Sequence, residues 1–112
     1  RKKQGRIVNI TSSIGSHGDE NAGLGSAQAM GTSFALAKSA VNALTARVAA
    51  EEREHGVIAN ALCPGFTATF EGAEEMGARP PAESAKGVIW AALLPSTGPT
   101  GGFFRDAKPL PW

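Results

Sequence analysis

The stretch GTSFALAKSAVNALTARVAAEEREH, residues 31–55, decides the fold, because no other segment has so long and regular a helical pattern. Gly31-Thr32-Ser33 is expected to cap this helix, and Gly56, after a cationic last turn, predicts its end. Lys38 lies one turn after Phe34, on the side of the apolar residues. Those residues recur at the spacing of one helix face, which predicts that the face is buried: Phe34, Ala37, Val41, Leu44, Val48 and Ala49.

Composition excludes several classes of protein. The 112 residues carry a net charge of +1, so the chain is at most one domain and has no global field for nucleic acid or an anionic membrane. No apolar run approaches the roughly eighteen residues that cross a bilayer. Cys63 is the single cysteine and no signal-peptide pattern opens the chain, which predicts a soluble cytoplasmic protein. His17 and His55 lack partners at metal-ligand spacing, so we expect no metal site.

The helix is flanked by two predicted strands. Residues 7–10 form a short β-branched run, and residues 57–63 form a second one that ends at Pro64-Gly65. Strand, helix and strand make a βαβ unit, whose right-handed crossover sets the two strands parallel. Thr11-Ser12-Ser13 then places hydroxyl groups at the carboxyl end of the first strand, where open α/β sheets bind their ligands.

The other segments complete a small α/β unit. Residues 16–30 and 66–81 read as loops, the second mobile and with room for one helical turn, and loops this long are usually functional or poorly ordered. Residues 82–94 predict a second helix and residues 102–105 a short third strand. The proline-containing tail from residue 106 is expected to be extended.

Three pieces of the chain resemble the C-terminal half of a short-chain dehydrogenase/reductase: GRIVNITSSIG (5–15), FALAKSAVNALTARVAAE (34–51) and NALCPGFTAT (60–69). The ending GPTGGFFRDAKPLPW is similar to that of carbonyl-reductase-like members. The resemblance implies an α/β fold, the C-terminal part of a Rossmann-type doubly wound parallel sheet with three strands and two main helices. Residues 1–112 would be the C-terminal half of one domain.

The N-terminal half of that domain is expected to be missing. The chain begins at Arg1 rather than at Met, and it lacks the glycine-rich turn with which the family cradles the pyrophosphate of its cofactor. The strand at residues 7–10 would then present an unpaired edge, which invites pairing with another chain.

The resemblance also assigns catalytic positions. The family's Asn-x-x-Ser matches Asn9 to Ser12, and its serine holds the substrate carbonyl, since a hydroxyl can donate to a developing oxyanion. In the family's Tyr-x-x-x-Lys the tyrosine donates the proton, and the lysine assists its ionisation and binds the nicotinamide ribose. Lys38 matches the lysine, but Phe34 occupies the tyrosine position in a chain with no tyrosine. A phenyl ring has no ionisable proton, so this site should reduce carbonyls poorly.

A cofactor-binding segment follows the second predicted strand. Pro64-Gly65 resembles the family turn that passes close to the nicotinamide, and Thr69 fits the threonine that contacts the carboxamide or the phosphates. Thr67 lies on the same approach. The resemblance therefore implies NAD(P)(H) as cofactor of the full-length parent, a small-molecule carbonyl or alcohol substrate, and a homo-oligomer such as a dimer or tetramer. Without the glycine-rich turn and the tyrosine, residues 1–112 alone are expected to form no competent dinucleotide site and to be inactive.

Structural alternatives stand beside these assignments. Ser12 could simply end a strand, Lys38 could snorkel from a helix shoulder, Phe34 could be a packing residue and Pro64-Gly65 could be only a turn. Three hypotheses follow for the function. The parent could be an NAD(P)-dependent oxidoreductase with chemistry altered at Phe34, it could be a pseudoenzyme that binds cofactor and serves as an interaction subunit, or the chain could be a truncated product without activity.

Overall fold

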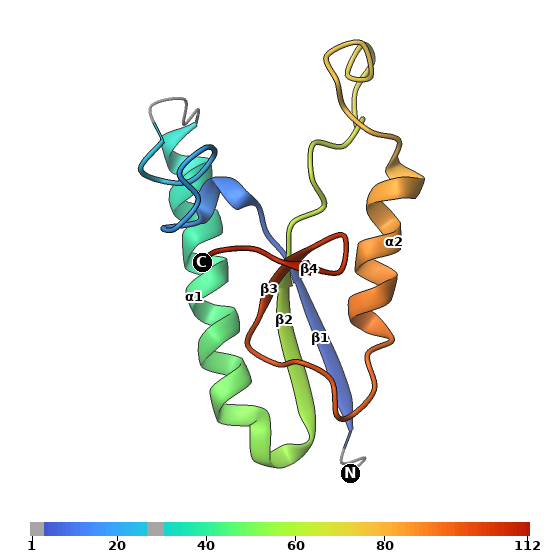
Figure 1. Cartoon of the computed structure of the whole chain (residues 1–112). Helices are drawn as coiled ribbons and strands as arrows, with labels where there is room; N and C mark the ends of the chain where they lie inside the picture. Colours follow the sequence, from blue (N-terminus) through green and yellow to red (C-terminus); the bar gives the residue numbers. More distant parts are fainter. Residues whose placement is uncertain (1–3, 27–30) are drawn as a thin grey trace.

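The computed structural model describes residues 4–26 and 31–112 (Figure 1). Its main elements are two helices and a sheet, joined by two short 3₁₀ turns at Ser13–Gly15 (η1) and Arg53–His55 (η2). In chain order, the strands and helices are β1 (Gly5–Ile10), α1 (Thr32–Glu52), β2 (Val57–Leu62), α2 (Pro81–Ala92), β3 (Phe103–Arg105) and β4 (Lys108–Pro109).

The four strands form one sheet in the order β1-β2-β3-β4. β1 runs parallel to β2, with Gly5 opposite Val57 and Ile10 opposite Leu62, and β2 runs parallel to β3. Figure 1 shows α1 and α2 on either side of the strands, so the predicted α/β fold with a parallel sheet is confirmed.

β4 is a strand that the sequence did not predict. It pairs antiparallel with β3, and the hairpin turn between them holds Asp106 and Ala107, both at positive φ (52° and 61°). Two central residues at positive φ are typical of a tight hairpin whose twist matches its strands. The tail that was expected to be merely extended therefore returns along β3.

The ends of α1 follow two different rules. Gly31, at φ 69°, is the N-cap residue, as expected of the Gly31-Thr32-Ser33 segment, and no side chain bonds the first turn. At the other end η2 is closed by Gly56 at φ 73°, the left-handed conformation that glycine adopts without strain, and the predicted glycine stop is confirmed.

The predicted buried face of α1 is right for Ala49 and wrong for Phe34, Ala37 and Leu44, which are exposed. Phe34 is 52% exposed and Leu44 is 57% exposed, while the buried residues of the helix are Ala35, Asn42, Thr45 and Ala49. The reason is that small and polar side chains allow the helix to approach the sheet closely. The larger apolar residues that dominate the periodicity are left on the outer surface.

Hydrogen bonds replace apolar contact on this inner face. The Thr11 hydroxyl donates to Asn42 Oδ1 at 2.6 Å, and Asn9 Nδ2 donates to Thr45 Oγ1 at 2.9 Å. A buried polar group is stable only when it is bonded in this way. The inner face of α1 is therefore matched to the carboxyl end of β1 by polar complementarity.

The core lies where β2 and β3 pair. Ala61, Cys63 and Phe103 form its buried cluster, and Leu110 packs against them. Phe103 also stacks on Trp112, with ring centroids 5.4 Å apart. The outer edge of β1 has no strand partner among the described residues, so the predicted free edge is confirmed for them.

α2 begins at Pro81, one residue before the predicted start, because proline suits the first turn of a helix. Residues 71–77 form a series of turns rather than a helical turn, and Thr67 and Arg79 make a short parallel bridge at the base of this loop. Neither helix in the described parts of the chain is long and apolar enough to cross a membrane.

Candidate functional site

A cavity of about 430 Å³ opens at the carboxyl ends of β1, β2 and β3, and we call it the strand-end cavity. Carboxyl ends of parallel strands are where α/β sheets bind ligands. Its wall contains most of the predicted site residues, together with others that were not predicted: Thr11, Ser12, Ser13, Phe34, Cys63, Pro64, Gly65, Phe66, Thr67 and Arg105. Folding thus brings together residues from the first strand end, the helix and the second strand end.

Ser12 lies two residues after the end of β1 and caps η1. Its Oγ accepts a hydrogen bond from the Ile14 N–H at 3.3 Å, so the hydroxyl oxygen is oriented by the 3₁₀ turn that follows. The hydroxyl proton has no acceptor among the described residues. Since a serine hydroxyl keeps one donor and a further acceptor site, Ser12 can donate to a group placed in the strand-end cavity.

The segment that carries Ser12 is held against α1 by a close backbone approach. A Cβ atom added to Gly15 would lie 2.5 Å from the Ser39 nitrogen and 2.6 Å from the Lys38 carbonyl carbon. No other residue fits there without moving the helix. Asn42 Nδ2 also donates to the Gly15 carbonyl at 3.4 Å, which fixes η1 on the helix.

Lys38 is held at the edge of the site. Its Nζ donates to the Ile10 carbonyl at 3.2 Å and lies 5.5 Å from the centroid of the Phe34 ring. A cation at this distance over an aromatic face is attracted by the ring. Phe34 therefore lines the strand-end cavity and contacts Lys38 instead of joining the core.

The turn after β2 forms the opposite wall. Gly65 has φ 78°, which favours glycine, and Thr67 Oγ1 donates to the Gly65 carbonyl at 3.1 Å. Thr67 Oγ1 also lies 2.6 Å from the Ser84 hydroxyl of α2. The Thr67 side chain is thus engaged by the turn and by α2.

Thr69 lies apart from the other predicted residues. It is exposed and lines a separate open hollow formed by residues 68–75, not the strand-end cavity. The reason is that the chain leaves the sheet at Leu62, the end of β2, and runs outward past the isolated Thr67–Arg79 bridge into the loop (Figure 1).

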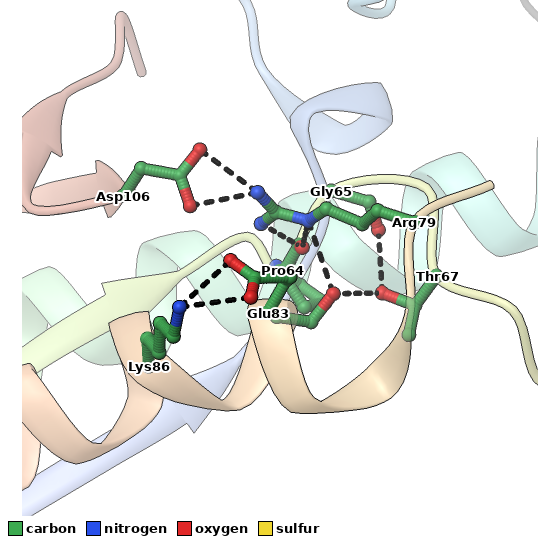
Figure 2. Close-up of polar contacts among 8 residues, drawn as sticks. Pro64, Gly65, Thr67, Arg79, Glu83, Lys86 and Asp106 are labelled. Atoms are coloured by element: carbon green, nitrogen blue, oxygen red, sulfur yellow. Dashed lines mark hydrogen bonds and ion pairs between the residues drawn. The ribbon is translucent and has the colours of Figure 1, made fainter. Parts of the chain in front are cut away.

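Sequence reasoning missed three residues that shape the site. Arg105 lines the cavity at the end of β3, and Cys63 accepts a hydrogen bond from the Ser13 N–H at 3.3 Å as well as packing in the core. Arg79 donates to the Pro64 carbonyl and to Asp106, as Figure 2 shows. Nothing in the local pattern around Arg79 distinguishes it from a surface arginine.

The cavity offers neutral donors and cations. Ser12 brings a hydroxyl with a free proton, whereas the Thr67 proton is donated to the Gly65 carbonyl or shared with Ser84. Positive charge comes from Arg105 in the wall and from Lys38 beside Phe34, and among the described residues no carboxylate lines the wall. Among residues 4–26 and 31–112 there is no cluster of three His, Cys, Asp or Glu side chains that could hold a metal ion. The arrangement suits a polar, uncharged or anionic organic group.

Comparison with known proteins identifies the family to which the chain belongs. A family model described as short chain dehydrogenase matches residues 1–78. The chain therefore belongs to the short-chain dehydrogenase family, as its motifs indicated.

Individual relatives are carbonyl and short-chain reductases. The chain is 39% identical over 64 residues to carbonyl reductase (NADPH) 1 of Rattus norvegicus, a match that covers 55% of this chain and 23% of that protein. It is 44% identical over 69 residues to the short-chain reductase protein NovJ of Streptomyces niveus, covering 62% of this chain and 22% of that protein. The matches thus span less than a quarter of each of these relatives.

Solved structures agree over nearly the whole chain. An NADPH-bound carbonyl reductase from chicken fatty liver superposes with a TM-score of 0.74 at 28% identity, covering 96% of this chain and 42% of that one. A 3-oxoacyl-(acyl-carrier protein) reductase of Brucella melitensis with bound NAD gives 0.68 at 27% identity, covering 93% and 40%. The predicted partial Rossmann-type fold is therefore confirmed.

Proposed function

We propose that the chain is part of an NAD(P)-dependent short-chain oxidoreductase that acts on the carbonyl or alcohol group of a small molecule. Residues 1–112 would be the C-terminal half of its single domain. The observation that carries this proposal is the strand-end cavity, which joins the Ser12 hydroxyl, the Pro64–Gly65 turn and Phe34 in one wall. The names of the similar reductases support the same class of reaction.

The chemistry of the cavity wall fits the nicotinamide end of a dinucleotide. Ser12 and Thr67 bring hydroxyl oxygens to the wall, and Lys38, outside the wall beside Phe34, brings a cation suited to ribose hydroxyls. The Pro64 carbonyl is bonded to Arg79, so the turn would contact the ligand through Gly65. When bound, the dinucleotide supplies the hydride. The predicted contact of Thr69 with the carboxamide or the phosphates is not carried into this proposal, because its hollow also holds Glu71, Glu74 and Glu75, whose carboxylates repel phosphate.

Each residue of the wall has a distinct proposed role. Ser12 donates its hydroxyl proton in a hydrogen bond to the substrate carbonyl oxygen as negative charge develops there. Lys38 orients the ribose. Phe34 takes the place of the family's proton donor and supplies an aromatic surface only, because its ring has no ionisable proton.

The test combines binding with turnover. The full-length parent is titrated with NADPH and NADH by calorimetry. Reduction of a panel of small aldehydes and ketones is then followed by the nicotinamide absorbance over long incubations, because turnover is expected to be slow. Ser12→Ala should lower turnover by roughly 10². Ser96→Ala, a matched change in an exposed turn, should not. Absence of dinucleotide binding, or equal turnover in both variants, would contradict the proposal.

A second function is favoured by the contact between Lys38 and Phe34. The chain could belong to a pseudoenzyme that binds the dinucleotide, carries out no hydride transfer and serves as an interaction subunit. Dinucleotide binding with no turnover of any carbonyl compound would support it. A truncated product would show neither binding nor a cooperative thermal transition.

The assembly and location of the whole protein belong to the proposal as well. A homo-oligomer is consistent with the apolar outer face of α1, where Phe34, Leu36 and Leu44 are each more than half exposed. Sedimentation of the purified protein tests this. The cytoplasmic location stays a prediction from cysteine usage.

A further inference from the structure

Arg79 joins three segments that are distant in the sequence. Its Nε donates to the Pro64 carbonyl at 3.0 Å and lies 3.1 Å from the Ser84 hydroxyl oxygen, and its Nη2 donates to the same Pro64 carbonyl. Its Nη1 contacts both carboxylate oxygens of Asp106, at 2.8 and 3.0 Å. Figure 2 shows the guanidinium between the turn after β2, the first turn of α2 and the β3–β4 hairpin.

The backbone of Arg79 bonds to the same segment as its side chain. The Arg79 N–H donates to the Phe66 carbonyl at 2.9 Å, and the Arg79 carbonyl accepts from the Ala68 N–H at 2.9 Å. The segment after the Pro64–Gly65 turn is therefore bonded to residue 79 along its length.

The guanidinium also packs on Gly65. A Cβ atom added to Gly65 would lie 3.1 Å from both Nε and Nη2 of Arg79, and Gly65 is at φ 78°. Glycine is thus required twice at this position, by the backbone angle and by the arginine. The turn that lines the strand-end cavity is backed by Arg79.

The ion pair with Asp106 fixes the orientation of the arginine. The Arg79 side chain is 28% exposed and that of Asp106 is 50% exposed, so solvent screens the pair and it contributes little to global stability. The pair instead fixes the orientation of the guanidinium, because the donors of this planar group form a rigid fork. Asp106 follows Arg105, which lines the cavity, so the pair links two walls of the same site.

We propose that Arg79, oriented by Asp106, is a positioning residue that fixes the Pro64–Gly65 turn in the shape the dinucleotide requires. The inference rests on the proposed function, since it assigns the turn to the nicotinamide end of the cofactor. Arg79 touches neither substrate nor reacting atoms and acts through the Pro64 carbonyl. Lysine cannot replace it, because one ammonium group cannot reach the carbonyl, the serine and the carboxylate in one plane.

The test uses the full chain and three variants with a matched control. Arg79→Gln removes the fork, Arg79→Lys keeps the charge alone, and Asp106→Asn leaves Arg79 in place without its ionic partner. The control is Lys86→Gln, which removes the neighbouring ion pair with Glu83 at 2.8 Å without touching the turn.

Two measurements are made on each variant. Amide hydrogen exchange compares the Ala68 N–H, bonded to the Arg79 carbonyl, with the Ala61 N–H, bonded to Gly102 inside the sheet. Calorimetry gives the Kd for NADPH. Arg79→Gln should speed exchange at Ala68 by about tenfold with no change at Ala61, and should raise the Kd by about tenfold. Arg79→Lys and Asp106→Asn should show smaller changes in the same direction, and Lys86→Gln none.

Other outcomes overturn the inference. Equal acceleration at Ala68 and Ala61 assigns Arg79 a purely structural role, and an unchanged Kd in Arg79→Gln shows that the turn needs no support. If Arg79→Gln does not fold, Asp106→Asn is used for the same comparison. Exchange rates and a Kd equal to those of Lys86→Gln would then count against the inference. The Kd comparison is made in the full-length parent, because residues 1–112 lack the glycine-rich turn. If the unaltered parent binds no dinucleotide, the proposed function fails, while the exchange measurement still decides whether Arg79 holds the turn.

Discussion

The ammonium nitrogen of Lys38 lies 5.5 Å from the centroid of the Phe34 ring, one helical turn away on α1. A phenol at residue 34 would place a hydroxyl next to this cation and to the strand-end cavity that Phe34 lines. The contact between the two residues therefore separates what the site retains, a cation and an aromatic surface, from what it lacks, a proton donor.

The first prediction concerns Phe34→Tyr. The added hydroxyl supplies an ionisable proton at the position of the family's acid, so turnover of small carbonyl compounds should rise by about 10² to 10⁴. The rate of NADPH consumption measures this. Phe34→Leu, which adds no proton, serves as the control and should give no increase. Equal rates for Phe34→Tyr and the unaltered chain would show that proton donation does not limit this site.

The second prediction tests the close approach of η1 to α1. In Gly15→Ala the new Cβ would meet the Ser39 nitrogen at 2.5 Å, so the free energy of unfolding should fall by about 1–3 kcal/mol. Denaturant unfolding measures it. Gly25→Ala is the matched control, because a Cβ there has no atom within 4 Å. An equal effect of the two alanines would contradict the packing of η1 on the helix.

The third prediction distinguishes the two faces of α1. Asn42→Leu places an apolar side chain on the buried face but removes the 2.6 Å partner of the Thr11 hydroxyl, and should cost about 1–3 kcal/mol. Leu44→Asn changes a residue that is 57% exposed and should alter stability by less than about 0.5 kcal/mol. Thermal unfolding compares them. If Leu44→Asn lowered stability more than Asn42→Leu, the face predicted from the sequence periodicity would be the buried one, and the observed packing of α1 would be contradicted.

The fourth prediction concerns the free edge of β1. An edge strand with exposed apolar residues pairs readily with other chains, and Ile7 is 37% exposed. The chain should therefore self-associate as its concentration rises, and Ile7→Lys should reduce this association. Sedimentation velocity measures the association. The control is Leu93→Lys, because Leu93 follows the end of α2 and is 76% exposed. A chain that stays monomeric at every concentration would contradict the prediction.

The sequence by itself determined the order of the elements. β-branched runs at residues 7–10 and 57–63 predicted β1 and β2 to within two residues, and Gly56 marked where the intervening helix stops. These features depend on local backbone preferences, which each segment carries with it. The sequence also predicted that Ser12, Pro64 and Gly65 would lie close together. Residues that follow parallel strands meet at one edge of the sheet, so the predicted strands were enough to place them.

Only the tertiary structure decided which side of α1 faces the sheet and what holds the cavity wall. Asn42 is buried because Thr11 lies opposite it, and Arg79 backs the turn because Asp106, 27 residues further along the chain, orients it. Thr69 falls outside the cavity for a similar reason, because the loop turns away from the sheet. Polar pairs between distant segments leave no periodic signal in the sequence. Each residue is buried or oriented only because folding brings its partner next to it.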